Sequence, residues 1–372
     1  MDNKKKKAPV HAASKQKKRK RYSKKVRITT IVGVCVMGVL AVLCIGVGAL
    51  VSNLLSGVGF QPGDTSIDPD FSLEEESGDE EPNWESAYQN AKALAELPLR
   101  KNTKHIKNYL LLGYDGMKNT GVRSDTNIIL SVNDKKKTIK LISLLRDTYV
   151  SLPGRDSNGD GKDDWGKLNS AYAYGGHTMQ AAMIRDNFRL EIDQYIGVNF
   201  TSLPIVVDAM GGLDIELTQR EMSQIPKAGL KKVPGDAGWA PMTGSAGVHH
   251  LDGFQTLQYA RIRHTDSDFQ RTARQRNVIT LMMGKAKTMN VGQILDVAKK
   301  ALSCVDTNMS PDELLGFAGN AMSYLNYTIE SDYYLPQQGD YLNKSYKGPG
   351  AVLEFKDQKK SVEALHHYIY DE

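Results

Sequence analysis

KNYLLLGYD (residues 107–115) is the first of three apolar or alternating runs that decide the fold. TNIILSVND (126–134) and TIKLISLLRD (138–147) follow it within a short span of chain. The first two runs end in Gly-Tyr-Asp and Asn-Asp, as strands commonly do. The three runs therefore predict strands of one sheet.

Further strands alternate with helical patterns along the rest of the chain. Apolar spacing predicts strands at 195–200, 211–217 and 351–355, and helices at 169–188, 202–211, 251–263, 269–289, 292–303 and 311–324, with a last helix at the C-terminus. No internal repeat is found. Strands interleaved with helices indicate a layered α/β fold.

The first fifty residues predict a membrane anchor. Residues 1–27 carry about thirteen basic side chains and one acidic one, which predicts a disordered tail. Residues 28–51 hold about 24 residues without a charge, enough to span a bilayer as a helix. A cleaved signal peptide would have a shorter apolar core and a small-residue cleavage site, so anchoring is favoured. Basic residues on the N-terminal side predict a cytoplasmic N-terminus and a single-pass protein of the cell membrane.

The remaining chain is divided into a stalk and a domain. Residues 52–103 are acidic and rich in Gly, Pro and Ser, which predicts a flexible stalk with a short helix at 84–97. Residues 104–372 form the predicted extracytoplasmic domain. The tail's charge of about +12 leaves roughly −7 for the exported part out of a net +5, which argues against a nucleic-acid partner. Cys304 is the only cysteine outside the span, so no disulfide framework is expected.

Charged side chains gather at the ends of the predicted strands. Arg123 and Asp125 are two apart where the second strand begins, so both project to one side if the chain is extended. Arg146 and Asp147 follow the third strand, at the carboxyl end where ligands bind in open α/β sheets, and Asp115 closes the first. The alternative interpretation is that each Asp caps a turn and each Arg pairs with it.

The stretch RIRHTDSDFQRTARQR (261–276) adds five arginines. Arg261 and Arg263 are two apart and share a side if extended. Asp268 lies at the N-cap or first turn of the long helix, where free N–H groups and the helix dipole favour anions. The first part of the stretch is therefore expected to form an extended edge beside a helix start.

The second part of the stretch is helical. Arg271 and Arg274 are three apart and share a face, whereas Arg276 lies off that face and is expected to be solvated. The alternative is an exposed helix with ion pairs, but no Asp or Glu stands at the spacing that follows Arg271 or Arg274. Arginines without a partner favour an external anion, and the planar guanidinium suits phosphate oxygens.

Carboxylates together with several arginines indicate phosphoryl transfer. Asp115, Asp125 and Asp268 supply oxygens suited to a hard divalent cation, and the arginines suit several phosphate oxygens, as in a diphosphate. No Ser-His-Asp or Cys-His arrangement and no P-loop is present.

At these residues the chain resembles the LytR-CpsA-Psr (LCP) family of mainly Gram-positive bacteria. The similarity runs from about residue 104 to 289, and its motifs are NYLLLGYD, VRSDTNIILSV, LLRDTYVSLPG, KLNSAYAYGG, VNFTSLPIVVDAMGGLDIEL, HHLDGFQTLQYARIR and DFQRTARQR. The resemblance implies a three-layer α/β/α domain with a central mixed sheet, preceded by one N-terminal transmembrane helix.

The resemblance also implies an activity and its residues. Such proteins are phosphotransferases that move a glycopolymer from a polyprenyl-diphosphate carrier to peptidoglycan through a phosphodiester. By motif, Asp115 and Asp125 would hold Mg²⁺ or Mn²⁺. The diphosphate and its reacting atoms would be surrounded by Arg123, Arg146, Arg261, Arg263, Arg271 and Arg274, with Asp147, Asp268 and Gln275 in support.

Two further features follow from the resemblance. The family has Pro before the Arg-Asp of its third motif, whereas this chain has Leu145, so the loop at Arg146 is expected to differ. The polyprenyl tail lies in an apolar tunnel in such proteins, and its candidate lining residues here, for each of which core packing is the favoured role, are Tyr172, Met179, Val278, Leu281 and Met282.

A second metal is suggested by DSNGDGKDD (156–164). Asp156, Asn158, Asp160 and Asp164 match positions of a calcium loop, but Lys167 replaces the bidentate Glu. An Asp/Gly-rich turn explains the same residues and is favoured over a structural Ca²⁺ site.

Two other functions remain open from the sequence. The same residues would serve a pyrophosphohydrolase that cuts a polyprenyl diphosphate with water, or a non-catalytic sensor of lipid-linked wall precursors. The pair Asp115 and Asp125 argues against the sensor, because anion capture alone needs no carboxylates. Teichoic acid, capsule and other wall glycans all present the same diphosphate, so the polymer is not specified.

Overall fold

The computed structural model describes residues 59–60, 80–82, 84–114, 122–192, 194–199, 201–262, 268–310, 313–314, 320 and 323–371. The predicted tail (1–27), the predicted span (28–51) and most of the predicted stalk lie outside these residues, as do Asp115 and Arg263. No helix in the described ranges is both long enough and apolar enough to cross a bilayer.

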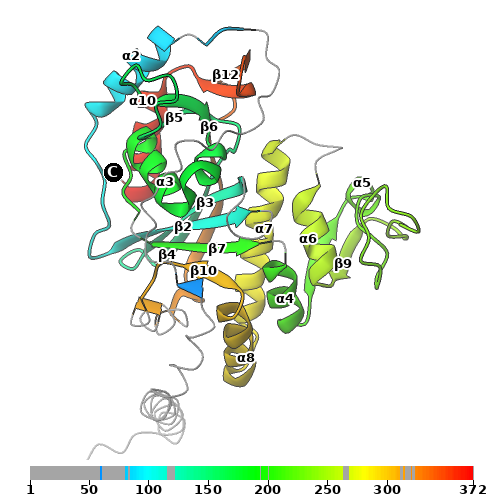
Figure 1. Ribbon diagram of the computed structural model, residues 1–372. Coiled ribbons are helices and arrows are strands. Elements are labelled where there is room, and N and C mark those ends of the chain that lie inside the picture. The colour runs from blue at the N-terminus through cyan, green and yellow to red at the C-terminus, as the bar shows by residue number, and fades with distance from the viewer. Residues whose placement is uncertain are drawn as a thin grey trace, which may run out of the picture. The chain divides into compact units, whose positions relative to one another are not determined.

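A mixed sheet of seven strands forms the centre of the domain (Figure 1). The three opening runs are confirmed as its antiparallel middle strands, β2 (Ile106–Tyr114), β3 (Ser124–Asn133) and β4 (Thr138–Leu144). The sheet order is β1-β10-β7-β2-β3-β4-β11. The outer strands are β1 (Gly59–Phe60), β10 (Val305–Thr307), β7 (Gln194–Asn199) and β11 (Thr328–Leu335).

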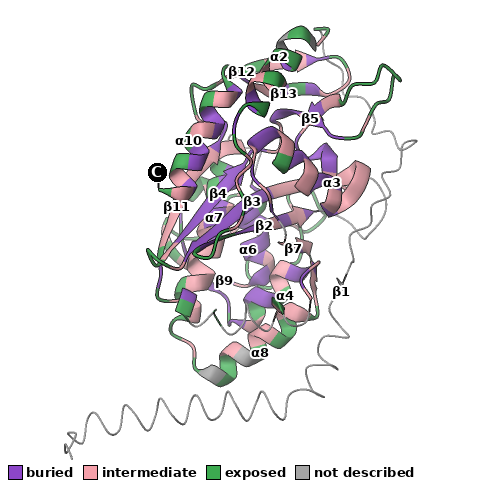
Figure 2. Ribbon diagram, turned by 90° about the vertical axis from the view of Figure 1, so that its left-hand side faces the viewer, coloured by how far each residue is buried: buried purple, intermediate pink, exposed green. Residues whose placement is uncertain are grey.

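Successive side chains of the middle strands pack into different apolar clusters, because they point to opposite faces of the sheet. Leu110 and Leu112 of β2 join a cluster with α2 (Trp84–Ala95), α3 (Ser170–Phe188) and α10 (Gln358–Tyr370). Tyr109 and Leu111 pack with Ile279 and Met283 of α7 (Asp268–Ala286). Helices therefore cover both faces, and Figure 2 shows the central strands as buried.

A smaller group of elements packs beside α7. It consists of α4 (Ser202–Ala209), the two-stranded ribbon of β8 (Leu213–Leu217) and β9 (Gly247–Leu251), α5 (Gln219–Met222) and α6 (Gly253–Arg261). Val278 of α7 joins its apolar cluster, so α7 contributes to both this group and the sheet. Helix α8 (Val291–Leu302) follows α7 along the chain and packs against α4.

Two hairpins lie above the sheet in Figure 1 and complete the described fold. They are β5 (Tyr149–Leu152) with β6 (Asp164–Lys167), and β12 (Tyr341–Tyr346) with β13 (Gly350–Phe355). Thr148 pairs with Leu353, which joins the two hairpins just beyond the end of β4.

The short helix expected at residues 84–97 is α2, and it is part of the packed body. Leu94 and Leu97 are buried in the cluster that includes α3 and α10. Glu96 also pairs with Lys359 of α10 at 2.7 Å. These residues therefore belong to the packed domain. The predicted boundary at Lys104 would instead place them in the flexible stalk.

A β-bulge distorts the pair β2 and β3 beside the ends of the strands. Gly113 pairs with Thr126 and Tyr114 with Ser124, so Asp125 is the extra residue of the bulge. A Cβ atom on Gly113 would lie 2.8 Å from Cβ and from Oγ1 of Thr126. Glycine is therefore required where the two strands approach each other at the bulge.

Replacing Gly113 by Ala should destabilise the protein. The added methyl group must displace Thr126, and overpacking of this kind costs about 1–3 kcal/mol. Gly284→Ala in α7 is the matched control, because nothing lies within 4 Å of its added Cβ, and it should leave the protein unchanged or stabilise it by up to about 1 kcal/mol. Urea unfolding of the full-length protein measures both. Equal stabilities of the two variants would contradict the tight contact.

Asp371 ties the end of α10 to the sheet. Its carboxylate accepts a hydrogen bond from the buried Lys140 of β4 at 2.6 Å and lies 3.2 Å from the exposed Lys136. Burial raises the pKa of Asp371, but hydrogen bonds and charge from the two lysines outweigh it and lower that pKa below its ordinary value. A lowered folded-state pKa gives stability that is present above the unfolded pKa, about 3.9, and is lost as pH falls through the folded value.

Asp371→Asn should therefore be less stable than wild type at pH 7, by about 1–3 kcal/mol, because a buried ammonium loses its partner. Asn tolerates the left-handed backbone at this position, where φ is 58°. The difference in the free energy of unfolding should shrink below about pH 4, as the wild-type carboxylate becomes protonated. Lys136→Met, which removes only the exposed partner, should cost less than about 1 kcal/mol. If the difference in the free energy of unfolding between wild type and variant does not change with pH, the ion pair is not its source.

Candidate functional site

The sheet topology brings several predicted residues to one edge. Strands β2 and β7 run parallel, β4 and β11 run parallel, and β3 runs antiparallel to both of its neighbours. The carboxyl ends of β2, β4, β7 and β11 therefore lie beside the start of β3. Asp125 at the start of β3 and the pair Arg146 and Asp147 after β4 consequently come together, as the sequence predicted.

Arg146 is the centre of this cluster. Its Nη1 donates a hydrogen bond to Oδ1 of Asp125 at 2.9 Å, and its Nε donates to Oδ2 of Asp147 at 3.2 Å. The same Nε lies 3.5 Å from Oδ1 of Asp268, the first residue of α7. One guanidinium thus contacts carboxylates from β3, from the segment after β4 and from α7.

The cluster remains partly accessible. The side chains of Arg146 and its three carboxylate partners are each exposed by 19–25%. Burial lowers the pKa of Arg146, but the charges of Asp147, Asp125 and Asp268 more than offset this effect and raise its pKa. Arg146 therefore stays protonated while part of its side chain remains exposed to solvent.

Arg271 brings α7 onto the bulge. It is 2% exposed, its Nη2 lies 2.6 Å from Oδ1 of Asp268, and the same nitrogen donates to the backbone oxygen of Asp125 at 3.2 Å. The prediction that Asp268 begins the helix is confirmed. The expectation that Arg271 lacks a carboxylate partner is wrong, because its partner Asp268 stands three residues before it in the helix and not after it.

Arg274 turns away from this cluster. Its Nη1 donates to Oε1 of Glu221 at 3.1 Å and its Nη2 donates to the backbone oxygen of Ile262 at 3.1 Å. Its guanidinium also lies 6.0 Å from the ring of Tyr259. The expectation of an unpaired arginine is therefore wrong here as well, since the partner lies 53 residues away in the chain and spacing within the helix cannot reveal it.

Arg261 does not lie on an extended edge. It is the last residue of α6 and is exposed, and the chain leaves the helix only at Ile262. The prediction of an extended pair is therefore wrong for its first member, because the helix continues to the arginine. Arg263, the second member, falls outside the described residues.

Arg276 is buried, so the expectation that it is solvated is wrong. Its side chain, on a residue 3% exposed, donates to Oγ of Ser143 on β4 at 2.6 Å and to the backbone oxygen of Ser331 on β11. Its guanidinium lies 6.0 Å from the ring of Tyr334, and burial lowers its pKa. Arg276 thus fastens α7 to the sheet, on a different side from Arg271.

The other predicted phosphate-binding residues are half-buried near the cluster. Arg123 directly precedes β3, two residues from Asp125. Gln275 follows Arg274 in α7, and its amide oxygen is buried without a hydrogen bond from any residue the structure describes. No described residue therefore donates to this oxygen, which is closed off from solvent.

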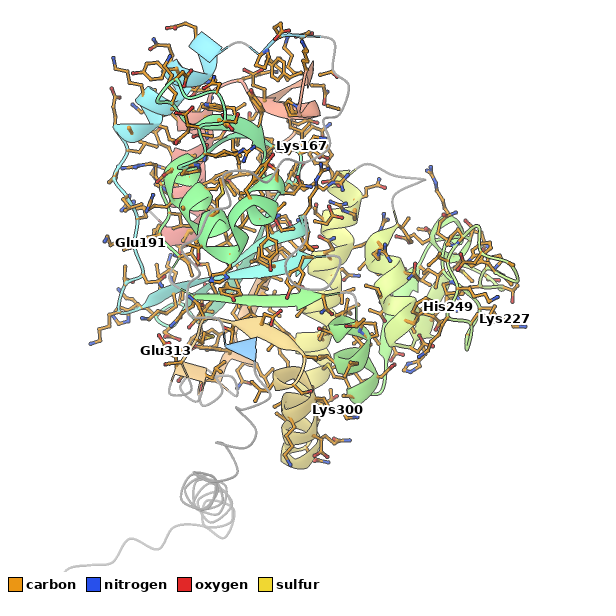
Figure 3. All side chains as sticks on the ribbon, in the orientation of Figure 1. Lys167, Glu191, Lys227, His249, Lys300 and Glu313 are labelled. Carbon is orange, nitrogen blue, oxygen red and sulfur yellow. The ribbon has the colours of Figure 1, made fainter. Side chains whose placement is uncertain are left out.

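Lys167 is a member of the cluster that the sequence did not identify. Its ammonium lies 3.6 Å from Oδ1 of Asp147, and its side chain is 11% exposed. Figure 3 labels it at the end of β6, in the hairpin beyond the sheet. The calcium-loop pattern identifies Lys167 only as the residue that replaces the Glu. Lys167 and Asp147 are twenty residues apart in the chain, so no local pattern indicates their contact.

Leu145 takes the position where the resemblance implies Pro. It is fully buried, and its backbone N–H donates to the carbonyl of Leu335 at the end of β11, at 2.8 Å. Proline could not donate this hydrogen bond. In this chain the segment before Arg146 is therefore fastened to the neighbouring strand through its backbone.

The metal prediction is only partly covered by the described residues. Asp115 lies outside them, and no group of three or more His, Cys, Asp or Glu side chains within them could hold a metal ion. Asp125 supplies one partly exposed carboxylate beside Arg146. Mg²⁺ commonly takes one or two carboxylates together with substrate phosphates, and the donor set at Asp125 is compatible with that mode.

The calcium-like loop is held together by hydrogen bonds from its own backbone to the side chain of Asp156. Asp156 accepts hydrogen bonds from the backbone N–H groups of Gly159, Asp160 and Gly161 at 2.7–3.1 Å. Asp164 pairs with Arg155 at 3.0 Å. Both contacts suit the Asp/Gly-rich turn that the sequence favoured.

The five candidate tunnel residues fall into two separate apolar clusters. Met179 is buried in the α3 side of the sheet, and Tyr172 packs on that cluster and stacks on Tyr114 at 5.1 Å. The α7 residues Val278, Leu281 and Met282 belong to the cluster around β8 and β9. The five side chains therefore do not form one continuous lining in this structure.

Comparisons with known proteins agree with the fold and the motifs. The model of the LytR_cpsA_psr family matches residues 73–362. The polyisoprenyl-teichoic acid–peptidoglycan teichoic acid transferase TagU of Bacillus cereus is 31% identical over 252 residues, covering 64% of this chain and 74% of TagU.

Two solved structures are similar at 25% sequence identity. The crystal structure of B. subtilis TagV has a TM-score of 0.56 and covers 72% of this chain and 99% of that chain. TagT of Bacillus subtilis bound to LI-WTA has a TM-score of 0.55, with 72% and 90% covered. Their likeness to the described residues confirms an α/β domain with a central mixed sheet.

Arg276→Ala should lower the free energy of unfolding by about 2–4 kcal/mol. The substitution leaves a cavity and deprives the buried hydroxyl of Ser143 and the half-buried carbonyl of Ser331 of their donor. Arg185→Ala in α3 is the control, because Arg185 is 48% exposed and pairs only with its neighbour Asp186 among the described residues; it should change stability by less than about 0.5 kcal/mol. Urea unfolding of the full-length protein compares the two variants. If Arg276→Ala leaves the free energy of unfolding unchanged, the side chain is solvated after all.

Proposed function

Because the chain belongs to the LytR-CpsA-Psr family, we propose that it transfers a glycopolymer from a polyprenyl-diphosphate carrier to peptidoglycan, forming a phosphodiester. TagU, its relative, is a transferase that joins teichoic acid to peptidoglycan. TagT, which shares the fold, has been solved bound to LI-WTA. The polymer of this chain is a teichoic acid, a capsule or a similar wall glycan.

The observation that carries this proposal is the cluster around Arg146. Cationic groups of Arg146, Arg271 and Lys167 stand among the carboxylates of Asp125, Asp147 and Asp268 at one partly open edge of the sheet. Fixed cations of this kind stabilise charge on phosphoryl oxygens, and they need no rearrangement during the reaction. A hydrolase or a sensor could use the same arrangement, but the relatives are named as transferases.

The reaction would proceed at the phosphorus nearest the glycopolymer. A sugar hydroxyl of peptidoglycan attacks that phosphorus, the bond to the bridging oxygen breaks, and polyprenyl phosphate leaves with the electron pair. Arg146 and Arg271, with Arg123, Arg263 and Gln275 around them, would bind the diphosphate oxygens and orient them in line with the attack. Asp125 and Asp268 are the candidate acceptors of the hydroxyl proton, because both carboxylates are partly exposed beside Arg146.

A divalent cation would complete the site. Asp115 and Asp125 would hold Mg²⁺ or Mn²⁺, which would neutralise charge on the diphosphate. Chelation of divalent cations should stop turnover and leave binding of the lipid-linked donor intact, whereas full turnover in excess chelator would remove the metal from the proposal.

The proposed reaction requires access to a lipid carrier. Residues 28–51 would anchor the chain as a single transmembrane helix, with residues 1–27 in the cytoplasm and the domain outside. Tags placed at each end of the chain should then differ in protease sensitivity in intact spheroplasts. Equal protection of both ends would contradict this topology.

Arg271→Ala should reduce transfer by about 10²–10³-fold, because it removes a fixed cation from the reacting phosphates. Arg185→Ala in α3 is the control, since Arg185 is exposed and pairs with its neighbour Asp186. It should retain full transfer. The assay incubates full-length protein with labelled lipid-linked polymer, with and without peptidoglycan, and separates the products.

The same assay decides between transfer and hydrolysis. Labelled polymer bound to peptidoglycan supports the proposed function. Release of free polymer phosphate at an equal rate with and without peptidoglycan would show a hydrolase instead. Full transfer by Arg271→Ala would exclude the proposed cation.

A further inference from the structure

An aromatic cluster lies beside the first turn of α7. The ring of Phe269, the residue after Asp268, stacks on the ring of Tyr341, with centroids 5.7 Å apart and an angle of 28° between the planes. The ring of Tyr334, near the end of β11, meets Phe269 edge to face at 5.3 Å. Three half-buried rings from α7, β11 and β12 therefore meet where the helix begins.

The hairpin that carries Tyr341 is fastened to the Arg146 cluster. The backbone N–H of Leu353 on β13 donates a hydrogen bond to the carbonyl of Asp147 at 2.8 Å. Leu353 pairs with Asn343 of β12, two residues from Tyr341, and the register between β12 and β13 is unbroken. The hairpin therefore holds Tyr341 in a defined position relative to Asp147, whose carboxylate contacts Arg146.

The two faces of β12 contact different parts of the domain. Tyr341 and Tyr346 are five residues apart, so their side chains point to opposite faces of the hairpin. Tyr346 is buried against Tyr149 of β5, with ring centroids 5.0 Å apart, whereas Tyr341 contacts Phe269 of α7. In Figure 1 the hairpin lies above the end of α7 at which the helix begins. The hairpin therefore connects β5 to the start of α7.

The first turn of α7 carries the carboxylate that joins two arginines of the site. Oδ1 of Asp268 lies 2.6 Å from Nη2 of Arg271 and 3.5 Å from Nε of Arg146. Helix ends open more readily than helix centres, because the first N–H groups have no partner within the helix. The contacts of Phe269 with Tyr334 and Tyr341 oppose such opening, since they hold the first turn against β11 and β12.

The aromatic contacts differ from the ionic ones in what can displace them. A diphosphate bound by Arg146 and Arg271 would compete with Asp268 for the same guanidinium nitrogens. Phosphate oxygens do not compete for the stacked rings of Phe269 and Tyr341. The aromatic contacts would therefore hold the start of α7 at the moment when the ion pairs of Asp268 are weakened.

We propose that Tyr341 is a positioning residue for the proposed transfer: stacked on Phe269, its ring keeps the first turn of α7, with Asp268 and Arg271, beside Arg146 while the diphosphate is bound. The inference rests on the proposed function, because it concerns the same site. It gives a role at that site to β12, which lies beyond the motifs that carry the family resemblance.

Hydrogen–deuterium exchange of the full-length protein in detergent, followed by mass spectrometry, measures the opening of this turn. In Tyr341→Ala the amides of residues 272–275, whose acceptors are the carbonyls of the first turn, should exchange at least about tenfold faster than in wild type. Tyr341→Phe keeps the ring and should exchange as wild type does. Leu342→Ala is the matched control and should also do so, because Leu342 is the next residue of β12, is 43% exposed and points to the opposite face.

Kinetics give a readout that a loss of global stability would not reproduce. In the transfer assay, at a temperature where each variant is folded, Tyr341→Ala should lower kcat at least about tenfold and leave KM for peptidoglycan within about twofold, because misplaced groups slow the chemical step. Tyr341→Phe should restore kcat. Tyr341→Leu, which keeps apolar bulk without a ring, should show the same two effects if Tyr341→Ala does not fold. Wild-type exchange or wild-type kcat without the ring would overturn the inference.

The exchange experiment needs no turnover, so the two proposals fail separately. Faster exchange in Tyr341→Ala, together with a wild-type protein that transfers nothing to peptidoglycan, would support the hold of Tyr341 on α7 and sink the proposed function. Transfer that depends on Arg271 but is unchanged in Tyr341→Ala would sustain the function and remove the positioning role.

Discussion

The arrangement of the candidate site depends on one guanidinium. Arg146 contacts the carboxylates of Asp125, Asp147 and Asp268, which belong to the start of β3, the segment after β4 and the start of α7. The three carboxylates repel one another, and the guanidinium between them offsets this repulsion where the three segments meet. Because removal of one member of such a partly buried group leaves the others uncompensated, the ion cluster enforces the geometry of the edge more than it adds to stability.

The backbone at this edge is shaped to fit the cluster. The bulge makes Asp125 the extra residue of β3, so its carbonyl is released from the strand pairing and accepts a hydrogen bond from Arg271. Gly113 permits the close approach of β2 to Thr126 beside the bulge. The side chain of Asp125 then faces Arg146 while its backbone faces α7. One residue thereby joins both halves of the site, and this explains why a local distortion occurs where the ladder would otherwise be regular.

The sequence predicted those parts whose signals are local. The middle strands are strong apolar runs, and their antiparallel pairing placed Asp125 beside Arg146 without further information. Strand β11 was missed, because TIESDYYL alternates poorly and its burial is irregular on both sides of a bulge. Arg276 was misassigned because helix periodicity assumes one buried face. Helix α7 packs against the sheet with Ile279 and against the β8–β9 group with Val278, so it has more than one buried face.

Because α7 is buried on more than one side, its arginines point in three directions. Arg271 and Arg274 are compensated by Asp268 and Glu221, but Arg276 has no carboxylate within ion-pair distance in the described part of the chain and relies on Ser143 and Ser331. A lysine there could lose its proton, whereas a guanidinium stays charged and its fork reaches two strands at once. Fastening α7 to β4 and β11 fixes its rotation about its axis. Since Arg271 and Arg276 lie on different sides of the same helix, a buried charge that does not contact the Arg146 cluster fixes the direction in which Arg271 reaches that cluster.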